Sequence, residues 1–222
     1  WWGGAGGGTV AHASIACFLG DTAETMMAFA ATCEPDIPRI ALVDFNNDSV
    51  KDSLLVMQRM FARYRELIDS GDETEAKRYQ LYAIRLDTSS SIRDVSVPPL
   101  GAPELDMGVN PRLVFIVRNA IDSAWCNWQL PRKWKDRARE WCESVKIVAS
   151  GGFSPSKILR FEKLDVPVDI FAVGSSLFAN DGPRVTDFTS DITQVKINGE
   201  WQAMSKVGRN RGHNPDLELV TE

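Results

Sequence analysis

The amino-acid sequence predicts an α/β protein, an incomplete parallel (β/α) barrel with a C-terminal antiparallel β-hairpin appendage. Four short segments rich in β-branched residues are hydrophobic almost without interruption, which is typical of parallel strands covered on both faces. Amphipathic helical patterns lie between these segments, as in βαβ units. Polar or small residues follow each segment, and this is where ligands bind in both barrels and doubly wound sheets.

The predicted strands, in order, are 39–45 (RIALVDF), 81–87 (LYAIRLD), 145–150 (VKIVAS) and 168–175 (VDIFAVGS). The predicted helices are 10–31, 50–69, 110–124, 132–142 and 154–164. The last helix opens with Ser-Pro, a cap followed by a first-turn proline. Gly/Ser loops follow the last two strands, and barrels hold phosphate in the loops after their final strands. We therefore favour a barrel over a doubly wound sheet.

The pattern changes after residue 178. Segments 191–197 and 200–206 flank Asn198-Gly199, a two-residue loop suited to a type I′ hairpin. We expect a partial α/β-barrel domain over 1–180, and over 181–222 a hairpin and extended tail that pack on the barrel or on a missing N-terminal domain. A Ser/Pro-rich connection between 88 and 108 is long for a compact domain, which is typical of a lid, a binding loop or disorder.

Composition excludes several classes of protein. With 222 residues and 44% hydrophobic content, the chain can bury one sizeable core. The net charge of -5 argues against a nucleic-acid-binding or membrane-surface protein, and no apolar run is long enough to span a bilayer. Four separated cysteines without CxxC indicate reduced thiols in a cytoplasmic protein, and two histidines at opposite ends indicate no zinc site. The start lacks an initiator Met, so we expect a piece of a longer chain.

The Gly/Ser loops predict a phosphate site. One loop contains Ser150, Gly151 and Gly152, and the other contains Gly174, Ser175 and Ser176. Glycines let backbone N–H groups approach a phosphate, and the start of helix 154–164 adds a positive dipole end. A glycine after a strand also makes ordinary turns, but two such loops on consecutive strands favour phosphate binding.

Charged residues end the two earlier strands. Arg85 and Asp87 alternate on one strand and therefore face the same side. A guanidinium suits a carboxylate or phosphate, whereas a carboxylate suits ribose hydroxyls or a magnesium-bound diphosphate. A structural Arg–Asp ion pair is the alternative. Asp44, which ends ALVDF, has the same two interpretations.

His12 lies just inside a predicted helix start, after a Gly-rich approach and Thr9. In such an anion site a histidine could accept or donate a phosphoryl group. A lone histidine is more often a polar core or surface residue, and the residues alone leave both interpretations open. Tryptophans 125, 128, 134 and 141 could stack a pyridine ring, but their spacing favours core packing in amphipathic helices.

Several of these segments together resemble one family. GGTVAH at 7–12, ALVDF at 41–45, IRLD at 84–87, the block 145–178 and the ending TDFTSDITQVKINGE are similar to nicotinate phosphoribosyltransferases, which are type II phosphoribosyltransferases. The resemblance covers nearly the whole chain. The block SGGF…KI…FE…VPVD…VGSSL is its most specific part, because the short motifs occur in many proteins.

The resemblance implies an enzyme that forms nicotinate mononucleotide and pyrophosphate from nicotinate and phosphoribosyl pyrophosphate, with Mg²⁺, in NAD salvage. Many members couple this reaction to ATP hydrolysis through a phosphorylated histidine, and His12 stands at that position. Arg85 and Asp87 would contact the base and ribose, while the Gly/Ser loops would hold the 5′-phosphate. The resemblance also implies a homodimer when complete, and an inactive chain if these 222 residues are the whole molecule.

The chain departs from the family pattern after the R-x-D strand. Many relatives have Ser-Gly-Asp there, whereas this chain has Thr88, Ser89 and Ser90, where local diphosphate and magnesium contacts are expected. Three alternatives stay open: a sibling phosphoribosyltransferase for nicotinamide or quinolinate, a catalytically silent phosphoribosyl-binding barrel fragment, and a generic phosphate-binding barrel isomerase.

Overall fold

A parallel sheet forms the centre of the protein. The computed structural model describes residues 9–174, 176 and 190–209, so the predictions for Ser175, for the Gly-rich start before Thr9 and for the tail beyond 209 lie outside the described residues. The four parallel strands are β1 (Arg39–Leu42), β2 (Leu81–Leu86), β3 (Lys146–Ala149) and β4 (Ile170–Phe171), paired in the order β1-β2-β3-β4. The predicted α/β class and parallel sheet are confirmed.

The sequential strand order also bears on the choice between barrel and doubly wound sheet. A doubly wound sheet reverses direction at a switch point, whereas barrel strands follow one another around the axis. The order β1-β2-β3-β4 has no reversal. The described strands nevertheless form an open sheet, so closure into a barrel stays a prediction.

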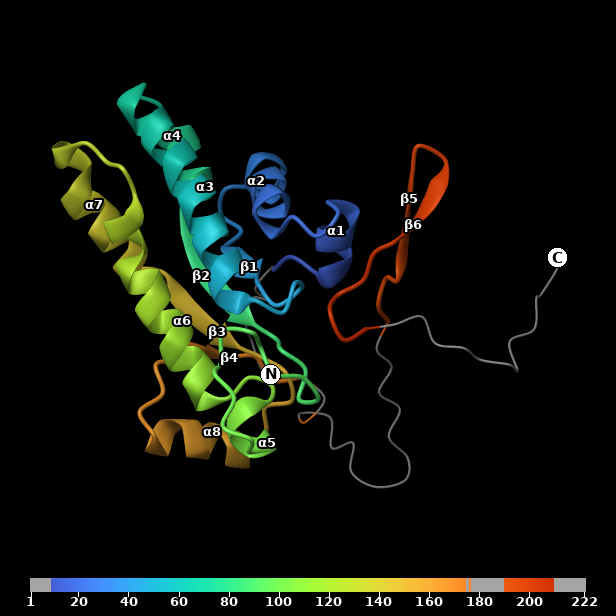
Figure 1. Ribbon diagram of the computed structural model, residues 1–222. Helices are drawn as coiled ribbons and strands as arrows, with labels where there is room; N and C mark the ends of the chain where they lie inside the picture. Colours follow the sequence, from blue (N-terminus) through green and yellow to red (C-terminus); the bar gives the residue numbers. More distant parts are fainter. Residues whose placement is uncertain (1–8, 175, 177–189, 210–222) are drawn as a thin grey trace, which may run out of the picture.

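Long helices cover one face of this sheet. Figure 1 shows α3 (Ser49–Asp69), α6 (Pro111–Ser123) and α7 (Arg132–Glu143) side by side, with α8 (Pro155–Lys163) beyond them. Four short elements fill the connections: α4 (Glu73–Ala76), η1 (Lys77–Tyr79), α5 (Pro103–Asp106) and η2 (Ala124–Asn127). The predicted cap of α8 is present, since the Ser154 side chain accepts from the backbone N–H of Lys157, and Asn110 caps α6 by accepting from the N–H of Leu113.

The single helix predicted over 10–31 is wrong. Two helices, α1 (His12–Cys17) and α2 (Thr22–Thr32), replace it. Leu19 and Gly20 have φ of 57° and 84°, a left-handed turn that ends α1, and the carboxylate of Asp21 then caps α2 by accepting from the Glu24 N–H at 2.8 Å. The Gly20-Asp21-Thr22 triplet carried this stop-and-start signal.

The two faces of the sheet are packed differently. On the helix side, Ile84, Leu86 and Ile147 join the main core. The tryptophans belong to this layer: Phe61 stacks on Trp128 with ring centroids 4.8 Å apart, and Trp134 and Trp141 meet Phe61 edge-on. Core packing of the tryptophans is therefore confirmed. On the opposite face Ile40, Ala83 and Val148 form a second, smaller cluster.

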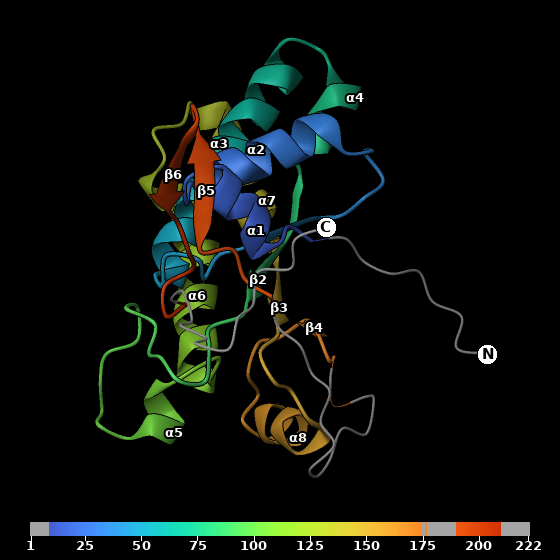
Figure 2. The ribbon, with the colours of Figure 1, turned by 90° about the vertical axis from the view of Figure 1, so that its right-hand side faces the viewer.

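The C-terminal hairpin consists of β5 (Gln194–Ile197) and β6 (Glu200–Ala203), paired antiparallel. Asn198 and Gly199 have φ of 50° and 89°, the two positive values that a type I′ turn requires, so the predicted turn is confirmed. Figure 1 shows the hairpin standing on the α1 side of the molecule, away from α7, and Figure 2 shows it beside α1. The domain boundary predicted at 180 falls among residues that are not described.

The connection between β2 and α6 is an ordered loop. The carboxylate of Asp94, fully buried, accepts from the backbone N–H and the hydroxyl of Ser49, and Asp106 accepts from the N–H groups of Leu100 and Gly101.

Among the described residues no helix is both long and apolar enough to cross a membrane. The four cysteines are free thiols, and burial raises the pKa of the Cys142 thiol to about 12.

Candidate functional site

Polar side chains meet where β1, β2 and β3 end. Ala83, Arg85 and Asp87 alternate along β2 and so share the sheet face that the long helices leave free. Ser150 follows β3 and Asp44 follows β1, one strand to either side. The parallel register carries all of them to one edge, which is the edge where the sequence predicts binding.

At the β1 end, Asp44 pairs with two bases. Its Oδ1 lies 3.0 Å from Nε2 of His12, and its Oδ2 forms an ion pair with Nζ of Lys206. The carboxylate side chain is fully buried, whereas 19% of the His12 side chain is exposed. Burial alone would raise the pKa of Asp44, but the hydrogen bond from His12 and the charge of Lys206 outweigh it and hold that pKa below its usual value. Asp44 is therefore ionised.

Lys206 is a site residue that sequence reasoning missed. It lies just after β6 and only 4% of its side chain is exposed. The backbone N–H of Val207 donates to the carbonyl of Phe45 at 2.9 Å, which fixes this segment against the end of β1, and Nζ of Lys206 also donates to the carbonyl of Asp87 at 2.9 Å. The sequence contains 25 Lys and Arg residues, and no local pattern distinguishes Lys206 from the others. The available indication was Asp44, a carboxylate that needs a cationic partner when it is buried.

At the β2 and β3 ends, a second hydrogen-bonded chain forms. Nε of Arg85 donates to Oγ of Ser150 at 3.0 Å, and that hydroxyl lies 2.7 Å from Oδ1 of Asp87. The Arg85 guanidinium is 3.7 Å from Oδ2 of Asp87, with about a quarter of its side chain exposed. Both predicted interpretations of this pair therefore have support: Arg85 and Asp87 are ion-paired, and both remain accessible.

The two Gly/Ser loops are tied together. Gly151 and Gly152 have φ of 86° and 71°, which favours glycine at both positions. Oγ of Ser176 donates to the carbonyl of Phe153 at 2.8 Å and so joins the loop after β4 to the loop after β3. A Cβ added at Gly174 would meet no atom of the described residues within 4 Å. The helix α8 begins directly after the first loop.

A lysine also lies beside the loop of Gly151 and Gly152. Nζ of Lys157, in the first turn of α8, donates to the carbonyl of Gly151 at 3.3 Å and lies 4.2 Å from the ring centroid of Phe153. Burial lowers its pKa. Thr9, in contrast, is used within the fold, because its hydroxyl donates to the carbonyl of Ile40 at 3.2 Å.

Three side chains at the strand ends form a candidate cation cluster. Ligand atoms of His12, Asp44 and Asp87 lie within 4.8 Å of one another. However, both oxygens of Asp44 already have partners, and the Lys206 ammonium already supplies the positive charge. A divalent ion would meet that ammonium at short range, so we assign no resident metal to this cluster.

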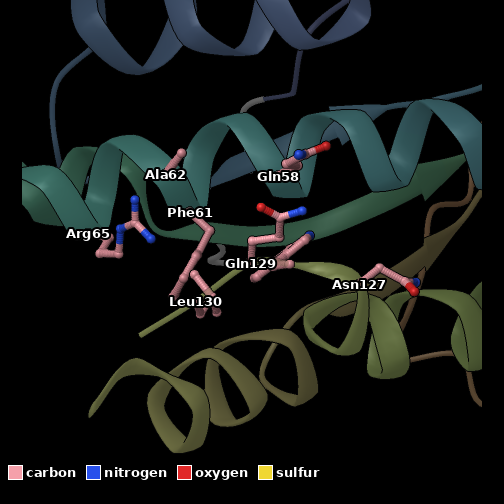
Figure 3. Close-up of a pocket in the computed structure, with 8 residues that line it drawn as sticks. Gln58, Phe61, Ala62, Arg65, Asn127, Gln129 and Leu130 are labelled. Carbon is pink, nitrogen blue, oxygen red and sulfur yellow. The ribbon is translucent and has the colours of Figure 1, made fainter. Parts of the chain in front are cut away.

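A separate pocket lies in the helix layer. Its volume is about 330 Å³, and Figure 3 shows its lining residues on α3 and on the chain that follows α6. The lining consists of Gln58, Phe61, Ala62, Arg65, Asn127, Trp128, Gln129 and Leu130. None of the predicted site residues is among them, so this pocket is distinct from the strand-end site.

Comparison with known proteins finds similarity to a solved structure. No protein-family model matches the chain, and no curated protein matches it. A crystal structure of nicotinate-nucleotide pyrophosphorylase from Pyrococcus furiosus is 26% identical in sequence, with 93% of this chain and 38% of that chain covered, at a TM-score of 0.43. Because a TM-score of this size does not establish a common fold, the similarity by itself assigns neither fold nor function.

Proposed function

We propose that this chain is the catalytic part of a nicotinate phosphoribosyltransferase, which joins nicotinate to phosphoribosyl pyrophosphate and couples the reaction to ATP hydrolysis through His12. The observation that carries the proposal is the gathering, at one sheet edge, of the His12–Asp44 pair, the Arg85–Ser150–Asp87 chain and the paired Gly/Ser loops. The motifs that resemble the family supply these same residues.

The arrangement suits displacement at an anomeric carbon. Such a reaction passes through an oxocarbenium-like state, so the site must fix the sugar and neutralise the leaving diphosphate. The loops at 151–152 and 174–176 would hold the 5′-phosphate through backbone N–H groups. The accessible Asp87 would accept from the ribose hydroxyls, and Arg85 would face the carboxylate of the base. Mg²⁺ would enter as part of the substrate, bound to the diphosphate oxygens.

The histidine pair suits phosphoryl transfer. The Asp44 carboxylate is ionised and can only accept, so a neutral His12 ring would donate from Nε2 and keep the lone pair of Nδ1. Nδ1 would attack the γ-phosphorus of ATP, forming an N–P bond as the P–O bond to ADP breaks. Hydrolysis of this phosphohistidine would return the imidazole and inorganic phosphate.

The direct test uses the full-length protein with nicotinate, phosphoribosyl pyrophosphate and Mg²⁺, with and without ATP, and measures nicotinate mononucleotide. We expect product that increases with ATP. In His12→Gln the ATP stimulation should disappear while basal transfer persists. Arg85→Met should lower kcat/KM for nicotinate about 100-fold, because a charged contact to the substrate is lost. Absence of product with any pyridine base would contradict the proposal.

Sibling phosphoribosyltransferases are the second candidate. The accessible guanidinium of Arg85 favours an anionic base, which fits nicotinate or quinolinate better than nicotinamide. Competition among the three bases for one pool of phosphoribosyl pyrophosphate separates these substrates. A protein that binds phosphoribosyl pyrophosphate without turning it over would instead be the catalytically silent module.

A further inference from the structure

We propose that Lys206 is a positioning residue of the strand-end site, which compensates the charge of Asp44 so that the imidazole of His12 stays neutral. The role acts through Asp44 rather than through contact with a substrate. The charge argument stands without the proposed function, whereas its purpose, a nucleophilic Nδ1 on His12, rests on it.

The argument begins with the buried charge. The Asp44 side chain is fully buried and ionised, and a lone buried carboxylate is strongly unfavourable. Two bases are available to compensate it: Lys206 at Oδ2 and His12 at Oδ1. With Lys206 ionised, the Asp44–Lys206 pair is already neutral. The histidine can then donate a hydrogen bond without itself taking up a proton.

The surroundings of His12 support the same assignment. The charged groups of the site come from three elements: Asp44 after β1 contacts the His12 ring, Asp87 after β2 has a carboxylate oxygen within 4.8 Å of a ring nitrogen, and Lys206 after β6 contacts Asp44. Arg85 lies against Asp87 and balances that second carboxylate. Asp44 is thus paired with Lys206 and Asp87 with Arg85, so no negative charge remains for the His12 ring to balance. Without Lys206, the ring would be the nearest group able to balance Asp44.

Lys206 is also held in place by the fold. Its second hydrogen bond reaches the carbonyl of Asp87, and the neighbouring Val207 N–H binds the carbonyl of Phe45. The ammonium therefore connects the ends of β1 and β2. The segment that follows the C-terminal hairpin is in this way a component of the site.

The test is nitrogen NMR of ¹⁵N-histidine-labelled full-length protein, with the His12 signals identified by their absence in His12→Gln. At mildly alkaline pH the wild-type ring should show one protonated and one unprotonated nitrogen. In Lys206→Gln, which keeps a hydrogen-bond donor but no charge, we expect both nitrogens of His12 to be protonated at that pH. Lys206→Arg should retain the wild-type pattern, because the charge is preserved.

A double variant isolates the cause. In Lys206→Met with Asp44→Asn, neither buried charge remains, so the ring should return to the neutral pattern. Lys196→Met is the matched control: this lysine lies exposed on β5 of the same hairpin, and its loss should leave the His12 signals unchanged.

A His12 ring that stays neutral in a folded Lys206→Gln protein would overturn the proposal. So would a ring that stays charged in the double variant, since Asp44 would not then be the cause. If the NMR result is as expected but no base gives product, the charge compensation stands and the proposed function fails. Near-UV circular dichroism of the tryptophan core checks that each variant is folded.

Discussion

The two ends of β1 each bury a charged side chain, but they use it differently. At the amino end, Arg39 is 2% exposed, and its guanidinium donates to the carbonyls of residues 30, 33, 34, 37 and 78. All five N–H donors are therefore satisfied by the fold. At the carboxyl end, Asp44 pairs with His12 and Lys206, and the neighbouring Arg85 and Asp87 keep part of their hydrogen-bonding capacity exposed.

This difference shows how a charged side chain with a structural role can be distinguished from one with a functional role. The Arg39 guanidinium donates to the backbone carbonyls of the segment between α2 and β1, and none of its N–H groups remains for a ligand. Among the described residues, the His12 ring bonds Asp44 through Nε2 and leaves Nδ1 for a ligand, and 21% of the Asp87 side chain is exposed. Burial alone does not distinguish the two ends, because Asp44 is as buried as Arg39. The two ends differ instead in the hydrogen-bond donors and acceptors that remain available to a ligand.

The largest expected effect comes from Arg39→Met. The change leaves several carbonyl groups of the α2–β1 segment without their donor, and each buried unsatisfied polar group costs about 1–3 kcal/mol. We expect the free energy of unfolding to fall by about 4 kcal/mol, measured by urea unfolding followed through tryptophan fluorescence. Arg139→Met, at an exposed position on α7, should change it by less than about 0.5 kcal/mol.

If the Arg39→Met protein had nearly wild-type stability, the Arg39 hydrogen bonds would contribute nothing to the free energy of unfolding. The structural role assigned to Arg39 would then be wrong. Transferase activity per folded molecule should be unchanged below the unfolding transition, because Arg39 lies at the opposite end of the strand from the site.

The second effect is a pH dependence of opposite sign at two acids. The pKa of Asp44 is held low, so its contribution to stability is complete above the unfolded carboxyl pKa and is lost as pH falls through the folded value. Burial raises the pKa of Asp52, so its ionised form costs stability above that raised value, and the cost is relieved as pH falls through it. Asp52 lies in the first turn of α3, the helix that follows β1 and Asp44.

We therefore expect Asp44→Asn to lower the free energy of unfolding by about 3 kcal/mol at neutral pH, with the deficit shrinking below about pH 4. Asp52→Asn should be neutral or stabilising at neutral pH, because an amide oxygen can still accept from Thr22 and Asn46. Urea unfolding at a series of pH values measures both. Identical pH profiles for the two variants would show that the partners of Asp44 do not determine its charge state.

Much of this architecture was predictable, because it depends on local patterns. Asp44, Asp87 and Ser150 lie within two residues of the ends of β1, β2 and β3, as expected from hydrophobic runs that stop at polar residues. The type I′ turn follows from Asn198-Gly199, whose backbone needs are local. Residue types thus identified the edge of the sheet and one turn without any knowledge of long-range contacts.

Two features were missed, for different physical reasons. Lys206 reaches Asp44 from 162 residues along the chain, a partner set by how the C-terminal segment packs. The separation of α1 from α2 had a local signal in Gly20-Asp21-Thr22, but the turn also needs a left-handed Leu19, a conformation that its residue type does not favour. Sequence reasoning found the acids of the site but not the cation that balances one of them.

The smallest expected effect separates two neighbouring glycines of the phosphate loop. Gly151→Ala and Gly152→Ala should each lower the free energy of unfolding by about 1 kcal/mol, because both residues have a positive φ that alanine tolerates poorly. A Cβ at 151 would lie 3.4 Å from the carbonyl of Thr88 and 3.6 Å from Oδ1 of Asp87, whereas a Cβ at 152 would meet none of the described atoms within 4 Å.

The two variants should therefore match in thermal unfolding but differ in substrate binding. The methyl group at 151 restricts the Asp87 carboxylate, so we expect the KM for phosphoribosyl pyrophosphate to rise about threefold to tenfold in Gly151→Ala, and less in Gly152→Ala. Equal increases in KM would place the importance of the loop in its backbone N–H groups rather than in its contact with Asp87. Because strain is matched between the variants, the difference in KM measures how far the strand-end chain of Arg85, Ser150 and Asp87 depends on the loop beside it.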